Sequence, residues 1–165
     1  MTKVLLSLML FTFLTNLLRA EVPLEVGAKA PQLQAVDHTG ATIDLGKALN
    51  DGTTLVFFYP KAHTGGCTKQ ACSLRDAWDE LQQRDVKVFG VSSDTAETQA
   101  SFKDKFTLPF TLIADTDQKV TEAFHKSRWS RQAYIFRDGT LVWRDLNAST
   151  SEQAADALTA LDALP

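Results

Sequence analysis

Two cysteines, Cys67 and Cys72, are the side chains in this sequence best suited to redox chemistry. They are the only 2 cysteines of the 165-residue chain. An apolar run at residues 55–59 precedes them, and its β-branched and aromatic residues are typical of a buried strand. Pro60 follows and is expected to end that strand, because proline lacks the N–H that the next hydrogen bond of the ladder needs.

A helix is expected to begin close to Cys67. Thr64, Gly65 and Gly66 form a loop of small residues, and apolar residues then recur at near-helical spacing as far as Leu81. Free backbone N–H groups and the positive end of the helix dipole stabilise an anion in a first turn. Thiols in such positions ionise more readily, and the thiolate is the reactive form. The sequence therefore predicts a nucleophilic sulfur at Cys67.

The spacing of the two cysteines bears on how they could pair. Five residues along an ideal helix separate the Cα atoms of Cys67 and Cys72 by about 8.6 Å. A disulfide needs Cα atoms closer than about 7 Å, so one turn would have to unwind first. This geometry favours a reversible disulfide over a structural one, although oxidising conditions outside the cytosol would favour either.

Metal binding and dithiol exchange are weaker interpretations of the same residues. Cys67, Cys72 and His63 are three possible ligands, whereas structural zinc takes four at closer cysteine spacing. The C-x-x-C pair of dithiol oxidoreductases is absent. We expect no metal and no cofactor.

The pattern Pro60-x-x-x-Thr64-x-x-Cys67 resembles the active-site signature of peroxiredoxins. The longer run from Gly66 to Cys72 is similar to the bacterioferritin-comigratory or Q-type branch, whose second cysteine lies five residues after the first. The similarity extends from about residue 27 to about residue 145 and includes Arg131, which matches a distant arginine of the family.

The resemblance implies a thiol-dependent peroxidase for hydrogen peroxide and organic hydroperoxides, acting in antioxidant defence. Cys67 would be the peroxidatic nucleophile, and Thr64 would orient the peroxide. Pro60 would shield the pocket, which Gly66 would also line. Arg131 would hold Cys67 as thiolate and stabilise the leaving oxygen. Without the resemblance, Pro60 is a strand terminator, Thr64 a helix cap and Arg131 a surface ion-pair residue.

Cys72 would be the resolving cysteine, which attacks the Cys67 sulfenic acid to form an intramolecular disulfide. A thioredoxin-like protein would then reduce that disulfide. Two positions depart from the family: Gly65 stands where a proline is usual, and Gln99 stands where many relatives carry a histidine.

Residues 1–20 are predicted to be a signal peptide. Lys3 precedes an almost wholly apolar stretch at 4–14, and small Ala20 closes the segment. An uncleaved membrane anchor and a buried helix are the alternatives. Export, to a periplasm where the cell has one, leaves no stable membrane association after cleavage and puts the protein beyond the reach of cytosolic thioredoxin.

Residues 21–165 are expected to form one thioredoxin-like domain. Its composition, 44% hydrophobic and 22% charged, is typical of a globular protein, and a net charge of −3 offers no reason to expect nucleic acid. We expect a monomer. Trp78, Trp129 and Trp143 are predicted to pack in or near the core, and His63 to lie in the loop at the mouth of the site.

Alternating β and α units predict a mixed, mostly parallel central sheet with helices on both faces and an N-terminal hairpin. Residues 92–95 are expected to cap a helix that runs to about residue 106, with Glu97 three residues after Asp94 as in a capping box. Hairpins are expected at 32–45 and at 133–144, where Asp138-Gly139 forms the turn. The other expected elements are strands at 86–91 and 110–114 and helices at 120–124 and 151–164.

Two other functions remain open at this stage. A thiol-disulfide exchange protein would use Cys67 and Cys72 on protein substrates. A non-catalytic thioredoxin-like binding domain would use their disulfide as a scaffold, although that role gives no reason for Thr64 and Arg131 to occur together.

Overall fold

The computed structural model describes residues 22–164. In chain order its elements are β1 (Gln34–Val36), β2 (Thr42–Asp44), α2 (Leu45–Asn50), β3 (Thr53–Phe58), α3 (Gly65–Asp76), α4 (Trp78–Gln83), β4 (Val86–Ser92), α5 (Ala96–Phe106), β5 (Thr111–Ala114), α6 (Lys119–Ala123), β6 (Gln132–Arg137), β7 (Thr140–Asp145) and α7 (Gln153–Asp162).

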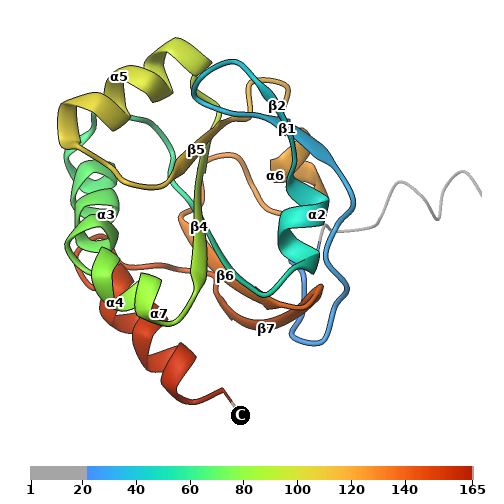
Figure 1. Ribbon diagram of the computed structural model, residues 1–165. Coiled ribbons are helices and arrows are strands. Elements are labelled where there is room, and N and C mark those ends of the chain that lie inside the picture. The colour runs from blue at the N-terminus through green and yellow to red at the C-terminus, as the bar shows by residue number, and fades with distance from the viewer. Residues whose placement is uncertain (1–21, 165) are drawn as a thin grey trace, which may run out of the picture.

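A five-stranded sheet in the order β5-β4-β3-β6-β7 forms the centre of the domain (Figure 1). The β3–β4 and β4–β5 pairs are parallel, whereas β6 runs antiparallel to both β3 and β7. Helices α3, α4, α5 and α7 lie on one side of this sheet, and α2 and α6 lie on the other (Figure 1). The predicted mixed sheet with helices on both faces is confirmed.

The central strand β3 contributes to a separate apolar core on each face of the sheet. Successive side chains of a strand point to opposite faces. Leu55 and Phe57 accordingly pack with the core under α3, α4 and α7, while Val56 and Phe58 pack with the core under α2 and α6. Burial on both faces explains why this strand is an unbroken apolar run.

The two predicted hairpins are both present. Strands β1 and β2 pair antiparallel as a small separate sheet. In the second hairpin, Asp138 and Gly139 take φ values of 47° and 75° between β6 and β7. Positive φ at both turn residues is the backbone that a two-residue hairpin favours and that an Asp-Gly pair supplies.

Helix α2 was not predicted, and the long helix after Cys67 is divided. The Asp44 carboxylate caps α2 by accepting the Lys47 N–H at 2.8 Å, and Leu45 and Leu49 are fully buried. Six residues with two apolar positions give too short a pattern for periodicity to reveal. The break between α3 and α4 falls at Ala77.

The predicted helix cap within residues 92–95 is confirmed, but the predicted capping box of Asp94 with Glu97 is wrong. Thr95 is the N-cap of α5, and its hydroxyl accepts the Thr98 N–H at 3.3 Å. Asp94 lies one residue outside the helix, and its carboxylate is directed toward the loop before Cys67. The Asp94 carboxylate therefore accepts a tertiary hydrogen bond from Ala62 instead of capping the helix.

One of the three tryptophans does not pack as predicted. Trp78 and Trp143 are half-buried against the core, but Trp129 is 63% exposed. The Arg128 guanidinium lies 4.8 Å from the Trp129 ring centroid. An aromatic ring covered by a cation need not enter the core, and sequence alone does not distinguish the two environments.

The described part of the chain contains no helix that is both long and apolar enough to span a bilayer. The predicted signal peptide, residues 1–20, lies outside the described residues. Export therefore stays a prediction.

A buried cation lies beneath the end of α6. Lys126 is 4% exposed, donates to the Ser127 carbonyl at 2.8 Å and has its Nζ 4.6 Å from the Phe58 ring centroid. Burial lowers the pKa of Lys126 to about 8, although the charge of Asp115 acts in the opposite direction.

This lowered pKa makes stability depend on pH. Between pH 8 and 10.5 the unfolded chain binds the Lys126 proton more readily than the folded one, so the free energy of unfolding should rise with pH. Relative to Lys126→Met, the wild type should gain about 2–3 kcal/mol across that window in urea titrations. Lys119→Met, at an exposed lysine, is the control: relative to this variant the wild type should show no such gain between pH 8 and 10.5. A constant difference between wild type and Lys126→Met would contradict the prediction.

Candidate active site

Cys67 is the third residue of α3, and its side chain is 2% exposed. Helix α3 begins at Gly65, two residues before the expected start at Cys67, and Cys67 lies in its first turn as predicted. The Thr64 side chain makes no cap hydrogen bond to the helix. The N–H groups of Gly65, Gly66 and Cys67 lie in the first turn, where the chain offers no carbonyl four residues back within the helix. These N–H groups can therefore stabilise negative charge next to the sulfur.

The register of the sheet brings Arg131 to the same place. Phe58, the last residue of β3, pairs with Gln132, the first residue of the antiparallel β6. Arg131, the residue before β6, thus lies next to the C-terminal end of β3, where the loop to Cys67 begins. A pair 64 residues apart becomes adjacent through this pairing.

The Arg131 guanidinium connects Cys67 to its surroundings. Its Nη2 donates to Cys67 Sγ at 3.4 Å, and its Nη1 donates to Gln70 Oε1. A Cβ on Gly66 would lie 3.2 Å from Thr150 Cγ2 and 3.4 Å from the same Nη2, so the backbone of Gly66 passes close to the guanidinium. The guanidinium thus places a fixed positive charge beside a buried sulfur.

Thr64 and Pro60 lie on the loop between β3 and α3. The Thr64 hydroxyl donates to the Lys61 carbonyl at 2.9 Å, which leaves its oxygen free to accept a hydrogen bond from a ligand. Pro60 is half-buried directly after the strand. These positions are compatible with the predicted roles, which remain predictions.

Asp94 fixes the middle of this loop. Its Oδ2 accepts the Ala62 N–H at 2.7 Å and the Ser92 hydroxyl at 2.7 Å. His63, the residue after Ala62, has a φ of 63°, and the centroids of its ring and the Phe102 ring lie 5.2 Å apart. Since αL backbone is unfavourable for a residue with a Cβ, the flanking hydrogen bond helps to hold this conformation.

Beneath the loop lies a buried polar network centred on Gln99. The Tyr59 hydroxyl donates to Gln99 Oε1, and Gln99 Nε2 donates to Ser92 Oγ at 2.9 Å and to the Ile113 carbonyl at 2.8 Å. Burial raises the pKa of Tyr59 above its ordinary range, and the charges of Asp94 and Cys67 add to this effect. Tyr59 therefore remains a neutral donor. Gln99, the predicted departure from the family, completes the network.

Cys72 lies in the same helix as Cys67 but is only half-buried, and both thiols are free. Because α3 is continuous over residues 65–76, the separation of about 8.6 Å between their Cα atoms applies. The predicted disulfide would thus require part of α3 to unwind.

Of the predicted site residues, Cys67, Gly66 and Arg131 are brought into direct proximity, Thr64 and Pro60 flank them in one loop, and Cys72 lies apart. Sequence reasoning assigned no role to Gln70 and Gln153, and it gave Asp94 only a role in capping the following helix. Gln70 stands three positions after Cys67, on the same side of a helix, and this spacing could have revealed it.

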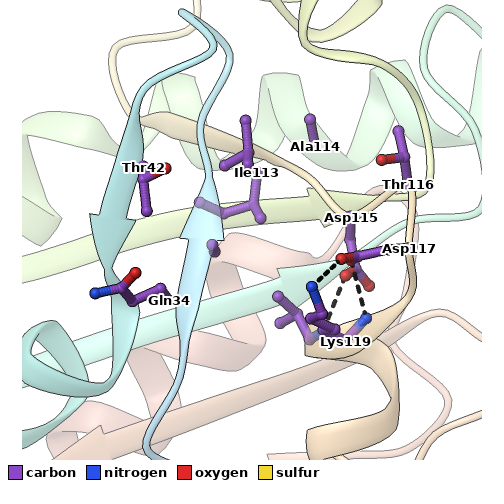
Figure 2. A pocket seen from close by; sticks show the side chains of 11 residues that line it. Gln34, Thr42, Ile113, Ala114, Asp115, Thr116, Asp117 and Lys119 are labelled. Atoms are coloured by element: carbon purple, nitrogen blue, oxygen red, sulfur yellow. Dashed lines mark hydrogen bonds and ion pairs between the residues drawn. The ribbon is translucent and has the colours of Figure 1, made fainter.

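A hollow between β1, β2, β5 and α6 contains none of the predicted site residues (Figure 2). Its acidic side chains are already engaged. Asp115 accepts from the N–H groups of Val120 and Thr121, each at 2.9 Å, and Asp117 forms an ion pair with Lys119. This hollow has no part in the chemistry of Cys67.

The chain matches the AhpC/TSA family over residues 26–144. The chain belongs to this family. A putative peroxiredoxin bcp from Coxiella burnetii is 42% identical over 101 residues, which cover 61% of this chain and 66% of that protein. Peroxiredoxin Bcp of Escherichia coli K12 is 41% identical over 113 residues, 68% of this chain and 70% of that protein. The predicted peroxiredoxin of the Bcp and Q-type branch is confirmed.

A solved relative shares the fold. The crystal structure of peroxidoxin BcpB from Mycobacterium tuberculosis superposes with a TM-score of 0.79 at 28% identity, covering 86% of this chain and 99% of that one. Xanthomonas campestris peroxiredoxin Q has the same fold at a TM-score of 0.77 and 24% identity. The thioredoxin-like prediction is thereby confirmed, and the relatives support a thiol-dependent peroxidase.

Residues that could bind a metal do not gather in the described structure: within residues 22–164 no three His, Cys, Asp or Glu side chains are placed to hold an ion. The groups around Cys67 are instead hydrogen-bond donors and one guanidinium. Such a site can activate a sulfur nucleophile and stabilise a leaving oxygen.

Replacing Asp94 tests its hold on the loop. Asp94→Ala removes the acceptor of two hydrogen bonds and should lower the free energy of unfolding by about 1–3 kcal/mol. Because the loop carries Thr64, kcat/KM for peroxide should fall roughly three- to tenfold. Urea titration and steady-state peroxide consumption measure the two effects.

The matched control is Asp117→Ala, which removes an exposed carboxylate far from Cys67 and should change stability by less than about 1 kcal/mol. Equal effects of the two substitutions would contradict the assigned role of Asp94.

Proposed function

We propose that Cys67 reduces peroxides as a thiolate, that Cys72 resolves the oxidised sulfur, and that a thioredoxin-like protein restores both thiols. The contact between Arg131 and Cys67, 3.4 Å from nitrogen to sulfur, is the observation that carries this proposal. It supplies a permanent positive charge at the one buried thiol of a helix N-terminus.

In the first step the Cys67 thiolate attacks one oxygen of the peroxide. An S–O bond forms, the O–O bond breaks, and the sulfur is oxidised by two electrons to a sulfenic acid. The departing oxygen takes a proton and leaves as an alcohol or, from hydrogen peroxide, as water. Arg131 stabilises the charge that develops on this oxygen. The Thr64 oxygen, whose own proton is donated to Lys61, accepts the peroxide O–H.

In the second step the Cys72 sulfur attacks the Cys67 sulfenic acid. An S–S bond forms, the S–O bond breaks, and the oxygen leaves as water. Part of α3 unwinds for this step, because its helical geometry holds the two Cα atoms too far apart. A protein dithiol then reduces the disulfide by thiol-disulfide exchange.

The two alternative functions explain less of the structure. A protein substrate for thiol exchange would need an accessible sulfur, whereas the Cys67 side chain is 2% exposed. A scaffold disulfide would need the cysteines within bonding distance in the folded state, whereas both are free thiols in one helix. A small substrate such as a peroxide suits the buried sulfur best.

Cysteine substitutions test the two steps. The wild type should consume hydrogen peroxide continuously in the presence of a dithiol protein reductant, and Cys67→Ser should fall to the uncatalysed rate. Cys72→Ser should react once with peroxide, gain the mass of one oxygen and form no intramolecular disulfide. Stopped-flow kinetics and mass spectrometry of the intact protein measure these results.

Free-thiol chemistry provides the comparison for this experiment. Peroxide consumption by the wild type at the rate of an equimolar small thiol, with Cys67→Ser unchanged, would rule out the peroxidase. Turnover by Cys72→Ser at the wild-type rate with the same reductant would leave the peroxidase intact but remove the resolving role.

We further propose that the chain is exported as a monomer and that its reductant works outside the cytosol. The proposal of export rests on the charge and apolar pattern of residues 1–20. Expressed with its own N-terminus in a bacterium that has a periplasm, the protein should appear there beginning at Glu21. A chain lacking residues 1–20 should stay in the cytosol. Uncleaved protein in the membrane would show an anchor instead, and uncleaved cytosolic protein would refute export.

A further inference from the structure

Gln153 has an unusual environment for a polar side chain. It is the first residue of α7, it is fully buried, and its Oε1 accepts from Gln70 Nε2 at 2.8 Å. Its own Nε2 has no hydrogen-bond partner among the described residues. A buried donor without an acceptor is unfavourable. The hydrogen bond that Gln153 does make, to Gln70, is therefore a candidate for a role in the active site.

The orientation of both amides follows from the chemistry of Arg131. A guanidinium has donors and no acceptor, so Gln70 must turn its Oε1 toward Arg131. Gln70 Nε2 then faces Gln153, which must present its own oxygen in return. This order leaves Gln153 Nε2 as the end of the chain. The unpartnered nitrogen is thus a consequence of directing Arg131 at Cys67.

We propose that Gln153 is a positioning residue for Cys67, acting through Gln70 and Arg131. The proposal rests on the proposed peroxidase function and adds to it a positioning contact from α7. Through Gln153, α7 fixes the Gln70 amide, and Gln70 in turn keeps Nη2 of Arg131 directed at the sulfur.

The same hydrogen bond also ties α3 to α7. Gln70 lies between Cys67 and Cys72, so any unwinding of α3 that brings the two sulfurs together must release Gln70 from Gln153. Gln153 therefore favours the attack on peroxide and opposes formation of the disulfide. Its removal should change the two steps in opposite directions, which a residue that only supports the fold would not do.

The test compares Gln153→Leu, which has similar size but no acceptor, with Gln153→Glu, which keeps one. In a Cys72→Ser background, Gln153→Leu should alkylate with iodoacetamide along a pH profile moved to higher pH. With both cysteines present, its sulfenic acid should form roughly five- to tenfold more slowly and its disulfide severalfold faster. Gln153→Glu should keep a rate of sulfenic acid formation closer to that of the wild type than Gln153→Leu does.

Leu158→Ala is the matched control, because Leu158 packs α7 against the same core and its side chain has no group that could hydrogen-bond to the amides. It should lower the midpoint of thermal unfolding and leave the alkylation profile in place. An unchanged profile in Gln153→Leu, or a parallel fall of both rates, would overturn the positioning role. Alkylation needs no peroxide turnover, so a wild type without peroxidase activity would refute the proposed function and leave this readout to decide on Gln153.

Discussion

The contact of Arg131 with Cys67 depends on a sheet register, and much of the structure serves to maintain that register. The two residues approach because β6 begins where β3 ends, with Phe58 paired to Gln132. A shift of β6 by one residue would turn Arg131 to the opposite face of the sheet. Burial of β3 on both faces, and of most of β6, makes such a shift costly, since it would exchange the side chains of two packed cores.

Around this contact the protein buries an unusual number of amides. Gln70, Gln99 and Gln153 are each fully buried in or near the site. Amides have directional donors and acceptors, so each one fixes the orientation of the next and passes geometry from one element to another. Gln99 connects Tyr59, the residue after β3, to β4 and β5, and Gln70 connects α3 to α7 and Arg131. The active-site loop is thereby supported from several elements that are distant in sequence.

The helix that carries Cys67 has two requirements that oppose each other. It must be folded to place the sulfur at its N-terminus beside Arg131, and it must open for Cys72 to reach that sulfur. The chain meets the first requirement in part with two hydrogen bonds, one that Asp94 accepts from Ala62 of the preceding loop and one that Gln153 accepts from Gln70 of α3. Opening of α3 must break the second of these hydrogen bonds, and local opening of this kind can leave the rest of a fold in place.

Local signals in the sequence determined the strand, the loop and the helix start around Cys67, and the Asp138-Gly139 turn, because apolar periodicity, proline and turn residues act over a few positions. Only the tertiary structure decided that Asp94 binds the loop at Ala62 rather than capping α5, and that Trp129 is exposed. The same holds for the chain of amides ending at Gln153, because a hydrogen bond between distant segments leaves no periodic mark in either of them. The chemistry of the site was thus encoded locally, whereas its geometry required the assembled sheet.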